Sequence, residues 1–338
     1  MRVAIVNDMP MAAEALRRAV LLRKQDEVVW VAGDGNEAVE LCLKDTPDLI
    51  LMDLIMPKMN GVQATREIMT RCPCPILVVT VSVNENAKMV FEAMGAGALD
   101  AVDTPALGSA DFEKVSAPLL AKLDSMRGLL GFKETRPAEH RGEPVPLSSN
   151  VPLVVIGASA GGPSALAEVL GHLPKDFPSP IIIVQHVDEQ FAPSLVGWLK
   201  QQSALPVKGA CEGDTPMPGV ALMAISGEHL VFVSPRRLGY RSDPKDVFYY
   251  PSVDVFFDSV ARRWPGDVVG VLLTGMGRDG AKGLKQLRDA GFHTIAQNKE
   301  SCAVYGMPKA AFELGAAVEV LPLTDIAAAL CRCCVPQK

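Results

Sequence analysis

The sequence predicts an α/β fold made of two doubly wound parallel-sheet domains. Three observations support this prediction: the chain has 338 residues, short apolar runs alternate with amphipathic segments, and a polar stretch interrupts that alternation near the middle. A chain of this length is too long for one ordinary hydrophobic core, and the alternation is typical of β-α units. We therefore expect one domain on each side of the interruption.

The first half carries five apolar runs that predict strands, separated by four segments that predict helices. The expected strands are Val3–Val6, Val28–Ala32, Leu49–Met52, Ile76–Thr80 and Ala101–Val102. The expected helices are Glu14–Leu22, Gly35–Lys44, Gly61–Cys72 and Asn84–Met94. This order predicts a first domain over residues 1–107.

The middle of the chain predicts a linker. Asp111–Leu130 has a helical rhythm, and Lys133–Asn150 then collects Pro, Glu, Arg, Ser and Gly. Such a composition cannot bury a hydrophobic core. We interpret residues 108–150 as a linker that begins with a helix and ends disordered.

The β-α alternation resumes after the linker and predicts a second domain over residues 151–338. Near-continuous apolar runs are typical of parallel strands covered by helices on both faces. The expected strands are Leu153–Ile156, Ile181–Gln185, Val220–Ala224, Leu230–Ser234, Val268–Leu273, Thr294–Ala296 and Ala317–Val320.

Composition narrows the class of protein. The formal net charge is −6 with no long basic run, which disfavours nucleic-acid binding. Neither a membrane-spanning apolar run nor a signal peptide is found, so we expect a cytoplasmic protein without membrane insertion. The eight cysteines lack paired CxxC spacing, which favours reduced thiols over a zinc site.

Polar residues follow the predicted strands of the first half. Asp8 follows the first strand, Asp53 follows the third, and Thr80 ends the fourth. Parallel sheets place their functional groups beyond the carboxyl ends of the strands, and two carboxylates there form an oxygen site for Mg²⁺ that a phosphoryl group can share. The alternative is that each aspartate only caps a turn or a helix.

Four motifs in this half resemble a two-component receiver domain. They are VNDM at 6–9, LILMDLIMPKMNG at 49–61, VVTVS at 78–82 and GALDAVDTP at 97–105. The resemblance implies a flavodoxin-like fold and phosphorylation by a histidine kinase. It implies Asp53 as the phosphoacceptor, Thr80 as the switch hydroxyl, and Mg²⁺ bound by Asp8, Asp53 and the backbone carbonyl of Ile55.

The first half departs from the receiver pattern at two positions. Asn7 stands where receivers usually carry another acid, and Thr104 stands where they carry a lysine before the proline. The first change removes a carboxylate that supports the metal. The second removes a cation that would hold phosphoryl oxygens, because threonine offers only a neutral hydrogen bond.

In the second half, a serine, a histidine and an aspartate follow predicted strands. Ser159 lies in the glycine-rich stretch VVIGASAGG, His186 follows IIIVQ, and Asp279 lies in the turn GMGRDG. A serine nucleophile needs a base, and the base needs a carboxylate to orient it. The stretch around Ser159 is also compatible with a phosphate-binding turn.

Each of these residues has a purely structural alternative. Ser159 and Asp279 could cap the helices that follow them, and His186 could be a half-buried histidine without a catalytic role. The order serine, histidine, aspartate differs from that of α/β-hydrolases, where the acid precedes the histidine. His140, His172, His229 and His293 lack a comparable place at a strand end.

Five motifs in this half resemble the catalytic domain of chemoreceptor protein-glutamate methylesterases, the CheB family. They are IGASAGGP at 156–163, IIVQH at 182–186, PSVDVFFDSV at 251–260, LLTGMGRDGAKG at 272–283 and AQNKESCAVYGMP at 296–308. A receiver joined to this domain by a linker is the architecture of that family.

This second resemblance implies a Rossmann-like fold and a serine esterase that needs no cofactor for its reaction. It implies Ser159 as the nucleophile, His186 as the general base and acid, and Asp279 as the orienting acid. The backbone N–H groups of Ala160 and Met276 would form the oxyanion hole.

The implied activity is hydrolysis of glutamate methyl esters on the cytoplasmic domain of a chemoreceptor, with release of methanol. Deamidation of receptor glutamines and control by receiver phosphorylation would accompany it. Ala160 replaces the usual threonine, and Tyr249-Tyr250 replaces a more basic and polar stretch. With these departures the chain most resembles the Wsp-type branch, which serves surface signalling.

Two other functions remain as alternatives. The second domain could be a binding module that docks a receptor, with its glycine-rich turn holding only an anion. A receiver-controlled transcription factor is disfavoured, because no basic recognition helix follows the linker.

Overall fold

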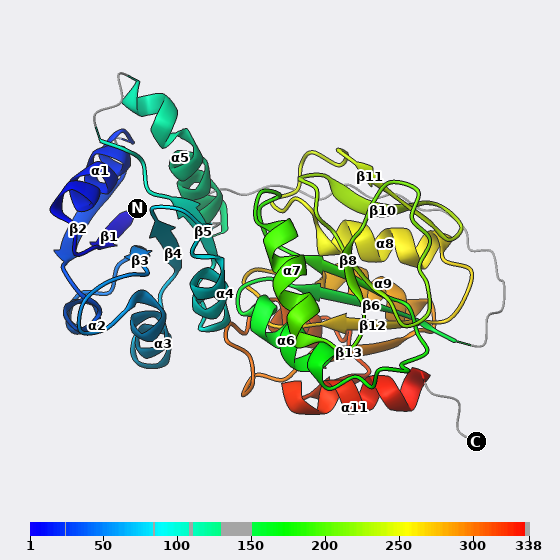
Figure 1. The fold of residues 1–338 in the computed structure, drawn as a ribbon. Helices are drawn as coiled ribbons and strands as arrows, with labels where there is room; N and C mark the ends of the chain where they lie inside the picture. The colour runs from blue at the N-terminus through cyan, green and yellow to red at the C-terminus, as the bar shows by residue number, and fades with distance from the viewer. Residues whose placement is uncertain (24, 84, 108–110, 130–150, 335–338) are drawn as a thin grey trace. The chain divides into compact units, whose positions relative to one another are not determined.

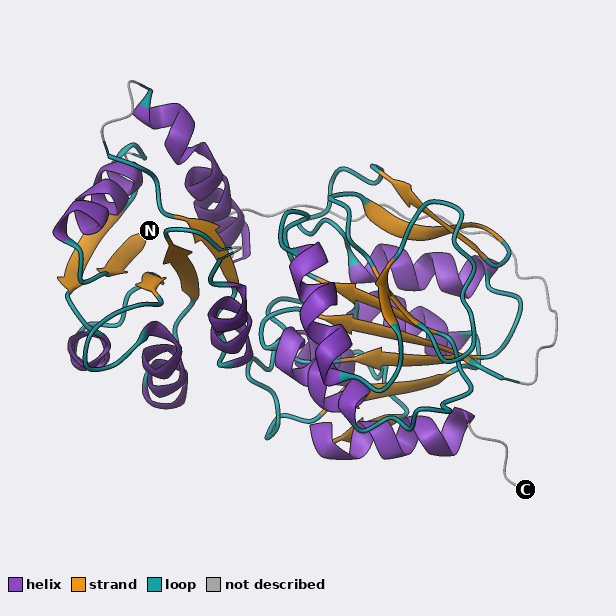
Figure 2. Cartoon of the chain, in the orientation of Figure 1, coloured by secondary structure: helices purple, strands orange, loops and turns teal. Residues whose placement is uncertain are grey.

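The computed structural model describes residues 1–338 except 24, 84, 108–110, 130–150 and 335–338, and it divides into two α/β units (Figure 1). The first unit is Met1–Glu134 and the second is Thr135–Lys338. Figure 2 shows that the main sheet forms the inside of each unit and that helices flank it. The expected fold class is confirmed.

The first unit contains a five-stranded parallel sheet in the order β2-β1-β3-β4-β5. Strands β1, β3 and β4 are almost entirely buried, as expected for strands with helices on both faces. The elements are β1 (Arg2–Val6), α1 (Pro10–Leu21), β2 (Glu27–Ala32), α2 (Gly35–Lys44), β3 (Leu49–Asp53), α3 (Gly61–Arg71), β4 (Ile76–Thr80), α4 (Ala87–Gly95), β5 (Asp100–Asp103) and α5 (Phe112–Leu129).

Helix α5 packs into the core of the first unit. Its buried residues Leu119, Leu123 and Met126 recur at helical spacing and pack with Leu16 of α1 and Leu49 of β3. The helix was expected near Asp111–Leu130 at the start of the linker, whereas its buried residues belong to the core of the first unit. The expected disordered segment Lys133–Asn150 lies outside the described residues.

The second unit contains a seven-stranded parallel sheet in the order β14-β13-β12-β6-β7-β9-β8. From β6 the chain builds outward through β7, and it later returns to add β12 on the opposite side of β6. The elements are β6 (Leu153–Ala158), α6 (Gly162–Gly171), β7 (Ile181–Gln185), α7 (Ala192–Gln202), β8 (Val207–Gly209), β9 (Ala221–Met223), β10 (His229–Ser234), β11 (Arg237–Arg241), α8 (Val253–Arg263), β12 (Val268–Leu272), α9 (Ala281–Asp289), β13 (His293–Gln297), α10 (Met307–Glu313), β14 (Glu319–Leu321) and α11 (Leu323–Cys334).

The β6–β12 boundary is a topological switch point. Ligand sites in open α/β sheets lie beyond the carboxyl ends of the strands at such a point. Gly157, near the end of β6, pairs with Leu272, the last residue of β12. A functional site is therefore expected at the turns that follow these two strands.

One expected strand of the second sheet is in a different place. Leu230–Ser234 belongs to β10, which pairs antiparallel with β11 in a separate two-stranded sheet. The expectation of a strand covered on both faces was wrong here, because the apolar run packs on one side only, with Phe232 against Phe256 and Trp264. Strands β8 and β11 were not predicted, since β8 is short and β11 is polar.

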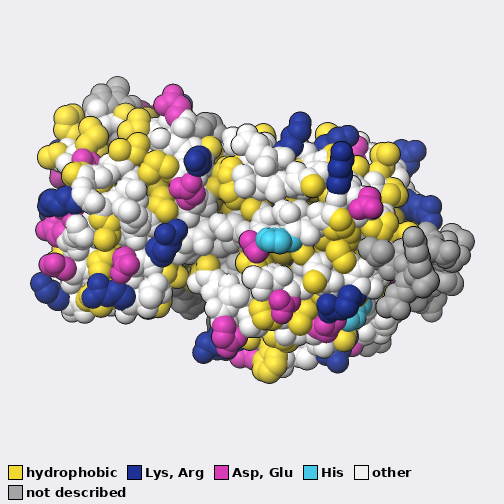
Figure 3. Space-filling view, turned by 60° about the horizontal axis from the view of Figure 1, so that its bottom comes forward, with side chains coloured by type: hydrophobic (Ala, Val, Ile, Leu, Met, Phe, Trp, Pro, Cys, Tyr) yellow, Lys and Arg dark blue, Asp and Glu magenta, His cyan; other side chains and the backbone are white. Residues whose placement is uncertain are grey.

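The described surface carries mixed charge. Figure 3 shows basic and acidic side chains interspersed on one face of the molecule, without a continuous field of one sign. Among the described residues, no helix combines the length and apolar character needed to span a membrane.

Candidate active site

Three side chains singled out by the sequence follow neighbouring strands of the second sheet. Ser159 follows β6, His186 follows β7, and Asp279 lies in the turn between β12 and α9. Ala158 and Gln185 are partners in the β6–β7 register, so Ser159 and His186 leave the sheet at the same level. The three residues therefore converge on the switch point.

The turn that presents Ser159 is held through its backbone. The Ser159 N–H donates to the Thr274 carbonyl at 3.0 Å, and the Ser159 carbonyl accepts from Gly162 N–H at 2.7 Å. The N-cap of α6 is Gly161, with φ of 77°, and no side chain caps this helix. The alternative that Ser159 serves as a helix cap is therefore wrong, and its side chain is free for another role.

Gln185 links the serine turn to the histidine. Its Nε2 donates to the carbonyls of Ser159 and His186, both at 2.9 Å, and the residue is fully buried. The absence of a side chain at Gly162 leaves room for this amide, because a Cβ there would lie 2.0 Å from Gln185 Oε1. Sequence analysis missed Gln185, although a glutamine ending a buried strand beside a histidine was a usable signal.

His186 and Asp279 form a buried pair. His186 Nε2 lies 2.7 Å from Asp279 Oδ2, and the two side chains are 8% and 9% exposed. Because a carboxylate only accepts, Nε2 carries the proton and Nδ1 carries the lone pair of the neutral ring. Nδ1 is buried without a hydrogen-bond partner among the described residues, so it is the nitrogen available to a nucleophile.

The structure records no hydrogen bond between Ser159 Oγ and His186 among the described residues. Ser159 is 6% exposed, and a Cβ at Gly275 would lie 2.8 Å from its Cβ, so the β12–α9 turn closes over it. Catalytic hydrogen bonds are often long without substrate and tighten when it binds.

The N-terminus of α8 holds the Asp279 carboxylate. Its Oδ1 accepts from Ser252 Oγ at 2.8 Å and from Asp254 N–H at 3.1 Å, and Oδ2 accepts from Val253 N–H at 2.7 Å. Burial raises the pKa of Asp279, but the His186 hydrogen bond and charge and these backbone N–H groups outweigh it, so the net pKa is lowered.

Asp279 is therefore held by the start of α8 and does not cap α9, the helix that follows it. The N-cap of α9 is Gly280, with φ of 83°, and no side chain caps that helix. The structural alternative for Asp279 is wrong for this reason.

Two groups behind Asp279, one buried and one partly buried, were not singled out as site residues by the sequence. His229 Nδ1 accepts from Ser252 N–H at 3.1 Å, and burial lowers the pKa of His229, which keeps the ring neutral. Asp254 Oδ1 accepts from Gly283 N–H at 2.7 Å, and burial together with the charge of Asp279 raises the pKa of Asp254. The first bond fixes the start of α8 against β10 and the second fixes it against α9, so together they hold the N–H groups that bind the Asp279 carboxylate.

The turns around Ser159 also offer backbone donors. The N–H groups of Ala160 and Met276 donate to no other residue that the structure describes. The Ala160 carbonyl accepts from Thr274 Oγ1 at 2.9 Å, and the Gly275 carbonyl accepts from Met307 N–H at 2.8 Å, which fixes both turns. Preorganised donors of this kind can stabilise a developing oxyanion.

The first unit brings Asp8, Asp53 and Thr80 to the carboxyl edge of its sheet, at the ends of β1, β3 and β4. Asp53 is 8% exposed, and its Oδ1 accepts from Leu54 N–H at 2.7 Å. Burial raises the pKa of Asp53 to about 6, the N–H groups of Leu54 and Ile55 oppose this, and the charge of Asp8 adds to it. No cation is among the groups of the described residues that shift this pKa.

This donor set fits Mg²⁺. The ion is usually held by one or two carboxylates and keeps several waters, and a cation beside Asp53 would offset the burial and the repulsion that raise its pKa. No cluster of three or more His, Cys, Asp or Glu side chains suited to a metal is found among the described residues. The carboxylates that this edge offers to a cation are those of Asp8 and Asp53.

The structure places both residues that depart from the receiver pattern at this edge of the sheet. Asn7 is buried and its Oδ1 accepts from Met9 N–H at 2.9 Å, so it closes the β1–α1 turn. Thr104 N–H donates to the Thr80 carbonyl at 2.8 Å, and the Thr80 hydroxyl accepts from Asn86 Nδ2 at 3.0 Å. The Thr80 hydroxyl is therefore hydrogen-bonded to Asn86, the residue that precedes α4.

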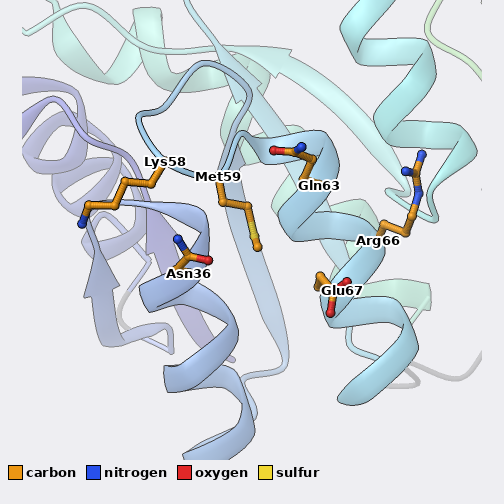
Figure 4. A pocket seen from close by; sticks show the side chains of 6 residues that line it. All are labelled: Asn36, Lys58, Met59, Gln63, Arg66 and Glu67. Carbon is orange, nitrogen blue, oxygen red and sulfur yellow. The ribbon is translucent and has the colours of Figure 1, made fainter.

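A hollow of about 350 Å³ in the first unit lies outside this edge (Figure 4). It opens between α2 and α3 and has mixed charge, and Lys58 is paired with Asp34 at 2.6 Å. No predicted site residue lines it. Its lining residues are Asn36, Lys58, Met59, Gln63, Arg66 and Glu67.

The eight cysteines are free thiols in the structure. The sulfurs of Cys42 and Cys74 lie 3.8 Å apart in the first unit. Burial raises the pKa of Cys302 to about 12, so this thiol, in the second unit, is not activated as a nucleophile.

Family models match both units. The model described as CheB methylesterase matches residues 154–330, and the model described as response regulator receiver domain matches residues 3–109. These matches coincide with the two parallel-sheet units.

Similar proteins extend the match over nearly the whole chain. A protein-glutamate methylesterase/protein-glutamine glutaminase of Mesorhizobium japonicum is 54% identical over 339 residues, covering 99% of each chain. A protein of Pseudomonas aeruginosa with the same name and the number 3 is 53% identical, covering 97% of this chain and 98% of its own.

A solved structure matches the second unit. The crystal structure of the Thermotoga maritima CheB methylesterase catalytic domain is 37% identical with a TM-score of 0.52, covering 54% of this chain and 98% of that one. The chain belongs to the CheB methylesterase family and carries a response regulator receiver domain ahead of the methylesterase domain.

Proposed function

We propose that this chain hydrolyses glutamate methyl esters on the cytoplasmic domain of a chemoreceptor, with receptor glutamine deamidation as a second reaction of the same site. The single observation that carries the proposal is the buried His186–Asp279 pair beside Ser159, at the switch point of a sheet whose family is CheB methylesterase. The names of the relatives from Mesorhizobium japonicum and Pseudomonas aeruginosa support both reactions.

In the first step, Ser159 Oγ attacks the ester carbonyl carbon and His186 Nδ1 takes the hydroxyl proton. The charged ring keeps its Nε2–H bond to Asp279, which stabilises the imidazolium. The carbonyl oxygen becomes an oxyanion, and the N–H groups of Ala160 and Met276 are the donors we assign to it.

The intermediate then collapses and the C–O bond to the methoxy group breaks. His186 gives its proton to the leaving oxygen, so methanol departs and the glutamyl group remains as an ester on Ser159. The same ring removes a proton from water, which hydrolyses that ester and restores the glutamate carboxylate. With a glutamine substrate, ammonia leaves in place of methanol.

For regulation, we assign the first unit as a receiver that a histidine kinase phosphorylates on Asp53. Asp8, Asp53 and the Ile55 carbonyl would hold Mg²⁺, which neutralises charge on the phosphoryl group. Thr80 would then exchange its Asn86 partner for a phosphoryl oxygen. The unphosphorylated receiver would cover the Ser159 edge, and phosphate would shift the population to an uncovered state.

The domain limits and the setting belong to this proposal as well. Residues 1–107 with α5 form the receiver, the segment up to residue 150 is the linker, and residues 151–338 form the catalytic domain. The protein would act in the cytoplasm on a methylated receptor, without nucleic acid or membrane insertion. Service in a Wsp-type surface-signalling system stays a prediction.

The test is methanol release by the full chain from a methylated receptor fragment. We expect Ser159→Ala to lose at least about a thousandfold in kcat while still binding the receptor fragment. Ser164→Ala, at an exposed position on α6, is the matched control and should keep its activity. Receptor binding without methanol release by the unsubstituted chain would favour the binding-module alternative.

A further inference from the structure

The ring of Tyr249 lies flat on the imidazole of His186. The ring centroids are 3.8 Å apart and the planes differ by 10°. The hydrogen bond from Nε2 to Asp279 fixes one atom of the imidazole but leaves the ring able to tilt about that bond. The stacked phenol removes this freedom, because tilting the imidazole would break a close face-to-face contact.

The hydroxyl of the same tyrosine reaches the turn that carries the second expected oxyanion donor. Tyr249 Oη donates to the Met276 carbonyl at 3.3 Å. Gly277, the next residue, has φ of 81°, and a Cβ there would lie 2.9 Å from this hydroxyl oxygen. One side chain thus contacts both the general base and the turn of the oxyanion hole.

The electrostatic setting keeps this tyrosine neutral. Burial and the charge of Asp279 raise the pKa of Tyr249, so the phenol keeps its proton and donates it to the turn. The face of a neutral aromatic ring attracts a cation, and His186 becomes a cation each time it accepts a proton.

We propose that Tyr249 is a positioning residue of the esterase reaction, which holds the His186 ring in the plane that directs Nδ1 at Ser159 and fixes the Met276 turn. This inference rests on the proposed function and deepens it. The neighbouring Tyr250 stacks on His229 at 4.6 Å and is 37% exposed, so the contact with the base belongs to Tyr249.

Three variants of the full chain separate the ring from its hydroxyl. Tyr249→Leu removes the aromatic face, Tyr249→Phe keeps the face and removes the hydroxyl, and Phe248→Leu is the matched control at a residue that is 51% exposed. Methanol release from the receptor fragment gives kcat and KM. The rate at which a small fluorophosphonate modifies Ser159 measures how well His186 activates the serine, without any contribution from receptor docking.

We expect Tyr249→Leu to lower kcat roughly tenfold, the equivalent of about 1.4 kcal/mol, with KM within about twofold. The rate of Ser159 modification should fall in parallel. Tyr249→Phe should keep kcat within about threefold, because the stack contributes more than one long hydrogen bond. Phe248→Leu should match the unsubstituted chain.

Three outcomes would overturn the inference: an unchanged kcat in Tyr249→Leu, a rise in KM with unchanged Ser159 modification, or equal loss in Tyr249→Phe and Tyr249→Leu. If Tyr249→Leu fails to fold, Tyr249→Met keeps the bulk without the aromatic face and takes its place. Ser159→Ala runs in the same series. Methanol release by that variant would refute the proposed function itself. If Ser159→Ala is inactive, the Tyr249 variants test the positioning role alone.

Discussion

Replacement of Asp53 by Asn should stabilise the first unit at neutral pH. The carboxyl is 8% exposed, and burial raises its pKa from 3.8 to about 6. Ionisation of Asp53 therefore opposes folding. Asn keeps an oxygen that can accept the Leu54 N–H, but it carries no charge and does not repel Asp8.

The magnitude follows from the pKa change. The pKa of about 6 in the folded unit against 3.8 in the unfolded chain corresponds to roughly 3 kcal/mol at pH 7, at about 1.36 kcal/mol per pH unit. This cost is absent below about pH 3.8, where the carboxyl is protonated in both states, and it is complete above about pH 6. The advantage of Asp53→Asn should therefore shrink as the pH falls from 6 to 4.

The assay is urea unfolding of the full chain, followed by hydrogen exchange in peptides from β1, β3 and β4. At pH 7 without Mg²⁺ the midpoint of the first unit should rise by roughly 1–2 M in Asp53→Asn. Glu92→Gln, which removes an exposed carboxylate on α4, is the control and should shift stability by less than about 0.5 kcal/mol. An unchanged or lower midpoint at pH 7, or a gain that persists at pH 4, would refute the reasoning.

Two further predictions concern the second unit. Gly162→Ala places a Cβ 2.0 Å from Gln185 Oε1, and this must displace the amide that links Ser159 to His186. We therefore expect kcat to fall at least about tenfold. A kcat within about twofold of the unsubstituted chain would contradict this role of Gln185. Deletion of residues 1–145 should raise methanol release from the receptor fragment, because it removes the receiver; an unchanged or lower rate in a folded truncation would count against autoinhibition.

Much of the fold could be predicted because the sequence pattern is local. Buried parallel strands are apolar along their length, so β4 and β7 were placed at their observed limits. The separate hairpin of β10 and β11 was missed, since the apolar run of β10 does not reveal which element it packs against. The packing of α5 was missed for the same reason.

The site was predictable only in part. The convergence of Ser159, His186 and Asp279 could be predicted because each follows an apolar strand, and the strand-end rule brings such residues together. The donors that hold the Asp279 carboxylate could not be predicted, because Ser252 and Val253 lie at the start of a helix that precedes β12 in the chain. Tyr249 was noted as a departure from the family pattern, but its stack on His186 depends on the path of a loop that no periodic pattern encodes.

The central claim is that Ser159 is the nucleophile and His186 its base, and covalent labelling tests it most directly. The full chain is treated with a small fluorophosphonate and digested, and the modified residue is located by mass spectrometry. We expect a single adduct, on Ser159, which forms equally in Ser164→Ala and is lost in His186→Ala. Two results would contradict this claim. One is an adduct at another residue that abolishes ester hydrolysis. The other is labelling of Ser159 in His186→Ala at the rate of the unsubstituted chain.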